Sequence, residues 1–259
     1  MSDTRTIGYC LAPILVSRFP APGGFDGTSA LDASPSPRCD NIMTDLDSPP
    51  FDHAVRGRFN AWFFSALDRY IDRVARPLKR IAFDGLDAAR VVEIGPGVGA
   101  NLRYLPAAAE LIAIEPNLRM HAPLRRRCAD AGITLTLVPG YADRLPLPDR
   151  SVDEVICSLV LCTVPDPDAV LAEATRVLRP GGRFRFVEHV AAPSGSPRAQ
   201  AQQALHKPWA WLFEGCDLHR DTASAIERAG FTRTTIVPMR PRGSIFYPVN
   251  TMICGTAEL

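Results

Sequence analysis

The chain has almost no net charge, and this absence limits the partners that it can bind. Its 259 residues include 29 Lys and Arg against 28 Asp and Glu, a formal net charge of +1. Proteins that bind nucleic acid or anionic membranes through bulk electrostatics carry a clear basic excess. We therefore expect no nucleic-acid partner. The composition, 46% hydrophobic and 22% charged, is that of an ordinary globular chain.

The chain also lacks local cysteine and histidine motifs. Its seven cysteines are scattered and odd in number, with no C-x-x-C pair, which argues against a disulfide scaffold or a zinc ribbon. None of its five histidines belongs to an H-E-x-x-H pair. We therefore expect no metal site. Scattered cysteines also fit a reducing compartment, so we expect the protein in the cytoplasm.

No hydrophobic run is long enough to cross a bilayer. Residues 7–16 form an apolar run of about half the ~20 residues that a spanning helix needs, and Pro13 interrupts it. Residues 1–48 are rich in Pro, Gly and Ser and show no helix or strand period. We expect a disordered extension without a stable membrane anchor. The alternatives are a secretory signal, weakened by Asp3, and a translation start at Met43.

Residues 49–87 carry one apolar stripe at helical spacing. Its members are Phe59, Trp62, Phe63, Ala66, Leu67, Tyr70 and Ile71. Pro77 is expected to end or bend this helix. Packing against a core accounts for such a stripe. The functional alternative is a lid helix whose aromatic side chains, Phe59 and Trp62, border a substrate pocket.

Residues 88–259 alternate between strand and helix patterns. We expect strands at 90–94, 111–115, 133–138, 152–158, 183–190, 232–238 and 247–256. Between them we expect helices at 100–105, 117–131, 167–178, 197–213 and 221–229. This order predicts a single α/β domain of Rossmann-like form, with a mostly parallel sheet and helices on both faces.

A glycine-rich turn follows the first expected strand. Glycines at 95, 97 and 99 permit a tight turn and let a ligand approach the backbone closely. Glu115 ends the second strand, 20 residues after Gly95, where its carboxylate can accept hydrogen bonds from both hydroxyls of a ribose. Gly95, Gly97 and Ala100 also satisfy the dinucleotide fingerprint, so this region alone leaves the cofactor open.

Two further segments carry a specific resemblance. Residues 153–166 and 171–182, together with 92–99 and 114–117, resemble the class I S-adenosylmethionine-dependent methyltransferases over about residues 88–190. The resemblance implies a seven-stranded sheet with an antiparallel last strand, and S-adenosyl-L-methionine as cofactor. It implies methionine contacts from the turn, a ribose contact from Glu115, and adenine contacts from the segments that follow the second and third strands. The residues so implied are Glu93, Gly95, Pro96, Gly97, Gly99, Asn101, Glu115, Pro116, Met120, Ala142, Asp143 and Cys157.

One departure and one narrower resemblance refine this picture. Quinone-methylating relatives have an aspartate where this chain has Tyr141, so Asp143 or water is left to meet the adenine amino group. Residues 157–164, 186–192 and 213–220 resemble the thiol S-methyltransferase family of animals. Members of that family carry a hydrophobic N-terminal anchor that the proline-rich front of this chain does not match. The resemblance implies methylation of small alkyl thiols.

The acceptor side is predicted from the segments after the fifth strand. His189 ends that strand and is the candidate general base, with a structural hydrogen-bonding role as the alternative. Aromatic residues nearby suit an apolar acceptor, although core packing also explains them, and we expect Trp211 in the core. Cys216 is either a reactive thiol or a small buried hydrophobe. The expected pocket residues are Phe59, Trp62, Leu161, Trp209, Phe213, Cys216 and His219.

These patterns predict a methyltransferase that acts on a small, fairly apolar molecule, with a thiol as the leading acceptor. Methyl transfer from a sulfonium releases a neutral thioether, so the site needs alignment and exclusion of water more than acid catalysis. A thiol is already partly ionised at neutral pH, and a base would help without being essential. The alternatives are a quinone, a phospholipid amine, a natural-product hydroxyl or carbon, and a cofactor-binding module without turnover.

Overall fold

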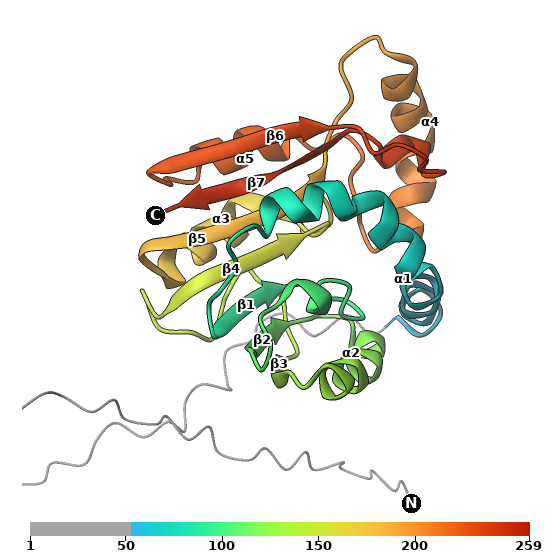
Figure 1. The fold of residues 1–259 in the computed structure, drawn as a ribbon. Helices are drawn as coiled ribbons and strands as arrows, with labels where there is room; N and C mark the ends of the chain where they lie inside the picture. Colours follow the sequence, from blue (N-terminus) through green and yellow to red (C-terminus); the bar gives the residue numbers. More distant parts are fainter. Residues whose placement is uncertain (1–52) are drawn as a thin grey trace, which may run out of the picture. The chain divides into compact units, whose positions relative to one another are not determined.

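The computed structural model describes residues 53–259, so the expectations for residues 1–48 and for Met43 lie outside the described residues. Seven strands form one sheet in the order β3-β2-β1-β4-β5-β7-β6 (Figure 1). β7 runs antiparallel to both of its neighbours, and the other described pairings are parallel. The predicted fold class is therefore confirmed. The strands are β1 (Arg90–Ile94), β2 (Glu110–Ile114), β3 (Thr134–Val138), β4 (Val152–Ser158), β5 (Leu178–His189), β6 (Arg233–Met239) and β7 (Met252–Glu258).

Helices cover both faces of this sheet, which explains why its central strands are apolar on both sides. Successive side chains of a strand point to opposite faces. Val91 packs with Leu78 of α1 (Ala54–Ala82), whereas its neighbour Val92 packs with Leu171 of α3 (Pro167–Val177). α2 (Leu118–Ala131) lies on the α1 side and α5 (Thr222–Arg228) on the α3 side (Figure 1). α4 (Pro197–Leu212) packs beside the 3-10 turn η3 (Tyr247–Val249).

Helix α1 continues through Pro77 to Ala82, so of the two expected effects of Pro77 the end of the helix is contradicted and a bend stays a prediction. A proline inside a helix costs about 3 kcal/mol because it removes a hydrogen bond and crowds the preceding turn. Burial of Leu78 and Ala82 against β1 and β4 offsets this cost. The buried guanidinium of Arg185 also holds the end of the helix, donating to the carbonyl oxygens of Ala82 (2.9 Å) and Asp84 (2.7 Å).

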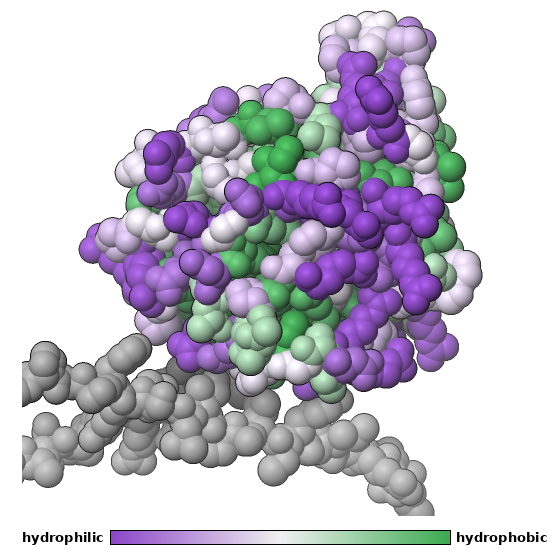
Figure 2. Space-filling model, viewed as in Figure 1, coloured by the Kyte–Doolittle hydropathy of each residue, from purple (hydrophilic) through white to green (hydrophobic). Residues whose placement is uncertain are grey.

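Figure 2 shows hydrophilic side chains in a band across the outward face of the molecule, over α1. The exposed positions of α1 include Arg69, Arg73, Arg76 and Arg80. The predicted apolar stripe is not the buried face of the helix, because none of its seven members is buried and Trp62 and Ala66 are exposed. Within residues 53–259, no helix combines the length and apolar content needed to cross a bilayer.

Several element boundaries, and the exposure of one tryptophan, differ from the sequence expectations. The expected helix at 100–105 is only a 3-10 turn, η2 (Leu102–Tyr104). The last strand begins at Met252 and not at residue 247, because Pro248 cannot donate to a strand ladder and lies in the turn η3. Trp211 is 62% exposed on α4, so its expected place in the core is wrong.

Candidate functional site

The glycine turn lies at the carboxyl edge of the sheet, where β1 and β4 lie side by side. Gly95, Gly97 and Gly99 have φ values of 61°, 57° and 90°, in the left-handed region that favours glycine. A Cβ on Gly95 would lie 2.5 Å from Cγ2 of Val160, which follows β4. A side chain at Gly95 is therefore excluded, because Val160 packs directly against the turn.

Glu115 lies beside this turn, as the sequence predicts. Its Oε2 accepts from the backbone N–H of Gly97 (2.8 Å), and its Oε1 accepts from that of Asn117 (2.8 Å). The side chain is buried, and loss of solvation raises its pKa to about 7. A carboxylate offers about four acceptor positions, so two remain for hydroxyl donors of a ligand.

Glu93 on β1 is fully buried behind the turn. Its Oε1 accepts from Nδ2 of Asn101 (2.7 Å), while its Oε2 has no hydrogen-bond partner. Desolvation raises the pKa of Glu93 to about 7. An unpaired buried carboxylate oxygen is costly, and a positively charged ligand group would satisfy it.

The other predicted cofactor residues divide between the turn region and its surroundings. Pro96 is buried in the turn, and Met120 packs with Val98. Pro116 is half-buried directly after Glu115. Ala142 is buried in the large core cluster, whereas Asp143 is exposed.

A buried carboxylate that the sequence did not single out shapes the loop after β4. Oε1 of Glu188 accepts from the backbone N–H groups of Val160 (2.9 Å) and Leu161 (3.0 Å), and Oε2 accepts from that of Cys162 (3.4 Å). Leu159 takes a left-handed φ of 62° at the start of this loop. Cys157 lies beneath it, fully buried, with its sulfur 3.7 Å from Oε1 of Glu188.

Next to this loop, two sulfur atoms and an imidazole converge. Nε2 of His189 lies 3.0 Å from Sγ of Cys216, and Sγ of Cys162 lies 3.9 Å from the same sulfur. The indole N–H of Trp209 donates to Cys216 (3.3 Å). Hydrogen bonding with Cys162, together with the charge of His189, lowers the pKa of Cys216, and the same pairing raises that of Cys162. We call these three residues, Cys162, His189 and Cys216, the thiol–imidazole cluster.

Aromatic side chains from α1 and α4 pack together beside this cluster. The Phe213 ring lies 4.5 Å from that of Trp209, 5.3 Å from that of Phe63 and 6.4 Å from that of Phe59. Trp62 is 64% exposed on α1, with its ring 6.0 Å from that of Phe59. Leu161, another predicted pocket residue, is fully buried in the core that α3 and α5 cover.

His219 belongs to a second group of titratable side chains. Its Nδ1 lies 3.9 Å from Oδ1 of Asp217, and Nδ1 of His206 lies 3.4 Å from the same oxygen. The two imidazole rings are 4.6 Å apart and half-buried. The sequence predicted His219 as a pocket residue but gave no sign of this grouping.

Asn117 and Glu214 connect the two sides of the site, and the sequence analysis missed both. Nδ2 of Asn117 donates to Oε1 of Glu214 (2.7 Å), which follows α4. Glu214 holds a left-handed φ of 56°, and burial raises its pKa to about 7. Both lie in segments that carry the resemblances described above, 114–117 and 213–220, and Asn117 also has the position of the N-cap of α2.

Comparisons with known proteins identify the family. Residues 92–186 match the family model described as a methyltransferase domain. The chain is 38% identical over 146 residues to thiol S-methyltransferase TMT1A of Homo sapiens, spanning 55% of this chain and 60% of that protein. It is 34% identical over 170 residues to thiol S-methyltransferase TMT1B of Rattus norvegicus, spanning 64% and 69%. The chain belongs to the S-adenosylmethionine-dependent methyltransferases.

Other methyltransferases are also similar to the chain. Phosphatidylethanolamine N-methyltransferase of Cereibacter sphaeroides is 30% identical over 156 residues, spanning 60% of this chain and 75% of that protein. Phosphoethanolamine N-methyltransferase 2 of Haemonchus contortus, solved with S-adenosyl-L-methionine, has the same fold with a TM-score of 0.53 and 15% identity, over 72% of this chain and 52% of that chain. A methyltransferase of Thermotoga maritima gives a TM-score of 0.51 and 20% identity, over 75% and 99%.

The residues of this methyltransferase fit the family's cofactor. The unpaired Oε2 of Glu93 suits the ammonium group of the methionine moiety. Glu115 retains acceptor capacity for the ribose hydroxyls. The site is therefore consistent with S-adenosyl-L-methionine.

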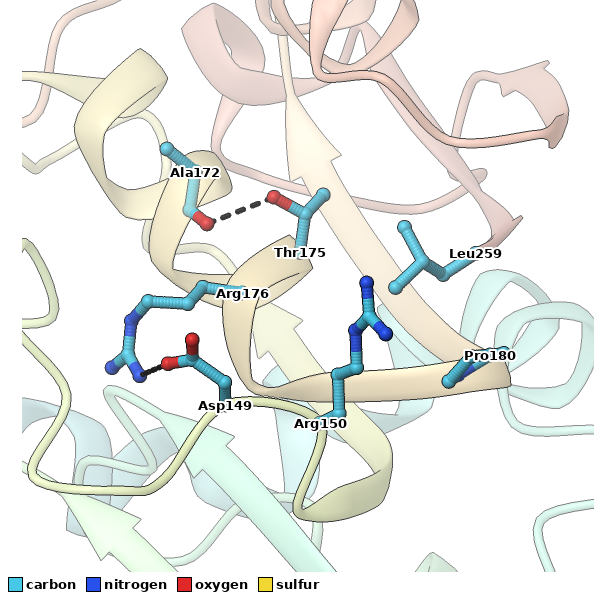
Figure 3. Close-up of a pocket in the computed structure, with 7 residues that line it drawn as sticks. All are labelled: Asp149, Arg150, Ala172, Thr175, Arg176, Pro180 and Leu259. Atoms are coloured by element: carbon cyan, nitrogen blue, oxygen red, sulfur yellow. Dashed lines mark hydrogen bonds and ion pairs between the residues drawn. The ribbon is translucent and has the colours of Figure 1, made fainter.

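A hollow in the surface of the methyltransferase lies at the opposite edge of the sheet. Its lining includes Arg150 before β4, Pro180 in β5 and Leu259 after β7 (Figure 3). β7 runs antiparallel, so Leu259 lies at the amino ends of the parallel strands. Ligands of open α/β sheets bind at the carboxyl ends. This hollow therefore has no part in the cofactor site.

Proposed function

We propose that this methyltransferase transfers a methyl group to the sulfur of a small, fairly apolar thiol. The observation that carries the proposal is the 34–38% identity to two thiol S-methyltransferases. The half-buried aromatic side chains of Phe59, Phe213 and Trp209 support it, because they offer apolar walls to such an acceptor.

The cofactor residues divide the work of binding. The turn at Gly95–Gly99 and Glu93 hold the methionine end, and Glu115 holds the ribose. Pro116, Met120, Ala142 and Asp143 lie toward the adenine, and Cys157 lies near the methionine end. When bound, S-adenosyl-L-methionine supplies an electrophilic methyl group and a neutral leaving group. The chain must then align the acceptor sulfur in line with that methyl and keep water out.

Helix α1 serves as the lid over the acceptor in this proposal. Nδ2 of Asn60 donates to the carbonyl oxygen of Leu212 (2.9 Å), which fastens α1 to the end of α4. Phe59 and Phe63 then face Phe213 across the same junction. Closing this junction excludes water from the acceptor, which strengthens every polar interaction inside.

His189 is the candidate base for the acceptor thiol. Its Nδ1 is buried and has no hydrogen-bond partner, while its Nε2 lies against Cys216. Desolvation alone would lower the pKa of His189. The attraction of the Cys216 thiolate for a protonated ring is larger, so the pKa of His189 is raised. Nδ1 would take the thiol proton as the new carbon–sulfur bond forms.

A phospholipid amine is the second candidate acceptor. The 30% identity to a phosphatidylethanolamine N-methyltransferase, over 75% of that protein, favours it. An amine acceptor must lose its proton before it attacks, so it needs a base more strictly than a thiol does.

A paired assay separates the two acceptors. The purified chain would be incubated with labelled S-adenosyl-L-methionine and either a small alkyl thiol or vesicles containing phosphatidylethanolamine. We expect the methyl thioether by mass spectrometry, well above the enzyme-free control and without methylated lipid. Calorimetry on the same sample confirms cofactor binding. Methylated lipid alone, or bound cofactor without either product, would refute the thiol proposal.

Gly95→Val is the matched control for this assay. Its side chain would enter the space of Val160 at a left-handed φ, so it removes cofactor binding through the turn alone. Product formation that survives Gly95→Val would come from a contaminating enzyme.

A further inference from the structure

The thiol–imidazole cluster brings together three donors that lie far apart in the sequence. Cys162 follows β4, His189 ends β5, and Cys216 follows α4. All three side chains are buried, with exposed fractions of 1%, 2% and 7%. Their ligand atoms lie within 4.8 Å of one another. Motif searches along the sequence miss this group because 27 residues separate each member from the next.

The spacing of these atoms matches that of a tetrahedral metal centre. A zinc ion with Zn–S distances of about 2.3 Å keeps two cysteine sulfurs about 3.8 Å apart. The sulfurs of Cys162 and Cys216 are 3.9 Å apart. Nε2 of His189 lies 3.0 Å from Cys216, so it needs to retreat by only a few tenths of an ångström to join the same coordination sphere.

The neighbours of the cluster resemble the outer shell of a metal–thiolate site. The indole N–H of Trp209 donates to Sγ of Cys216 (3.3 Å), and Oγ1 of Thr163 lies 3.5 Å from Sγ of Cys162. Such contacts fix the orientation of the ligands and tune the metal. Two thiolates also balance the charge of a divalent ion, which suits a buried site.

We propose that Cys162, His189 and Cys216 bind one zinc ion and leave its fourth coordination position open. Two thiolates and an imidazole favour zinc over harder divalent ions. Three protein ligands with an open position are the pattern of catalytic zinc sites, whereas structural sites are closed by four. This inference opposes our sequence expectation of no metal site.

The open position suits the acceptor sulfur, a step that rests on the proposed thiol activity. The thiol would bind zinc as a thiolate and release its proton to water. Its sulfur would then form a bond to the methyl carbon while the sulfonium carbon–sulfur bond breaks, leaving a neutral thioether on each product. With zinc bound, His189 would be a metal ligand and no longer the general base. Zinc would then promote loss of the proton from the acceptor thiol.

Proximity to the cofactor turn supports this step. The loop that ends in Cys162 also carries Val160, which lies directly against Gly95. The segment that carries Cys216 also carries Glu214, which accepts from Asn117 beside the ribose-binding Glu115. The cluster and the cofactor residues thus share both loops.

Cobalt titration of the full chain tests the metal site without any turnover. The protein would be stripped with a chelator and titrated anaerobically with Co²⁺. We expect one equivalent per chain, with near-ultraviolet bands from thiolate-to-cobalt charge transfer and intense visible bands of a tetrahedral centre. Zn²⁺ should abolish both, because it displaces cobalt.

Single variants then assign the ligands. Cys162→Ser and Cys216→Ser should each weaken Co²⁺ binding at least tenfold and weaken the charge-transfer bands. The control Cys128→Ala removes a buried thiol on α2 and should leave binding unchanged. Trp209→Phe keeps the ring but loses the N–H donor, and should bind about tenfold more weakly. This variant keeps the test decisive if a cysteine variant fails to fold.

Several outcomes would overturn the metal site. They are a wild-type chain that binds less than one tenth of an equivalent, spectra without thiolate bands, and binding that His219→Asn abolishes but Cys162→Ser does not. The last result would place the ion on His206, Asp217 and His219. The thiol assay gives an independent answer. Metal binding without methyl thioether refutes the thiol acceptor alone, and methyl thioether from a chain that binds no metal refutes the zinc site alone.

Discussion

At the scale of single residues, the site is built from carboxylates that are shielded from water. Glu93, Glu115 and Glu214 are all buried or mostly buried, and desolvation raises the pKa of each to about 7. The cofactor of the family carries a positive sulfonium and a positive ammonium group. Ionised carboxylates are unfavourable in the empty site because they are desolvated. A cationic ligand favours their ionised form, and this attraction contributes to the free energy of binding.

Replacement of Glu115 by Gln should weaken cofactor binding. The amide lacks the charge that we propose accepts from the ribose hydroxyls, and hydrogen bonds to charged groups contribute about 1.5–3 kcal/mol. We expect calorimetry to give a dissociation constant at least tenfold higher than that of the wild type. Glu110→Gln, on the exposed start of the same strand, is the control and should bind normally. Equal affinity in both variants would contradict the ribose assignment.

The free protein should lose stability as the pH rises from 5 to 7. Glu93 has a folded pKa of about 7 against an ordinary value of 4.5, so folding favours its neutral form. Stability is full below pH ~4.5 and falls as the pH rises through 7. We expect a loss on the order of 1–2 kcal/mol from Glu93 in urea unfolding. Glu93→Gln should show a flatter pH profile, and parallel profiles would refute the effect.

At the scale of elements, one buried ion pair joins helix α1 to the sheet. Arg185 on β5 donates to both carboxylate oxygens of Glu154 on β4, at 2.7 and 2.9 Å. The same guanidinium donates to the backbone just past α1, at Asp84 and Gly85. A single side chain thus fixes two strands and the end of the helix that carries the proposed lid.

Arg185→Met should destabilise the fold strongly. It leaves the buried Glu154 without its close partner, with only the partly exposed Arg183 nearby, and breaking a buried pair in this way costs about 3–5 kcal/mol. Chemical unfolding should show that loss in the free energy of unfolding. The control Arg183→Met removes an exposed guanidinium 3.7 Å from the same carboxylate and should cost less than about 1 kcal/mol. Similar losses in the two variants would contradict the anchoring role.

At the scale of the whole described molecule, the cofactor side and the acceptor side are joined by hydrogen bonds that bypass the sheet. Asn117 reaches Glu214, and Asn60 reaches Leu212, so α2, α1 and the end of α4 meet at one junction. A ligand that orders Glu115 and Asn117 should therefore also order the segment that carries Phe213 and Cys216.

Hydrogen exchange tests this connection. With S-adenosylhomocysteine bound, we expect severalfold slower exchange in the first half of α1 and in residues 213–219, as well as in the glycine turn. Helix α3 packs on the opposite face and should exchange at its unliganded rate, which makes it an internal control. Protection confined to residues 95–117 would show that the two sides are independent.

The sequence predicts correctly those features that depend on local patterns, such as strand limits and the residues at strand ends. β1 and β4 have the predicted limits, and the glycine turn and Glu115 lie together because the carboxyl ends of parallel strands share one edge. It missed what only the fold brings together. Glu188, Asn117 and the thiol–imidazole cluster draw their partners from distant segments. Pro77 does not end α1, because tertiary packing outweighed a local rule. The expected burial of Trp211 is wrong, because this apolar residue stays exposed.

The place of β7 in the sheet has a consequence for biosynthesis. β7 pairs with both β5 and β6, and it is the last of the three strands to be made. Until β7 inserts between them, β6 has no partner strand and the edge of β5 is open, so both can pair with other chains. A chain truncated after residue 245, which has β6 but lacks β7, should therefore aggregate or bind chaperones where the full chain does not.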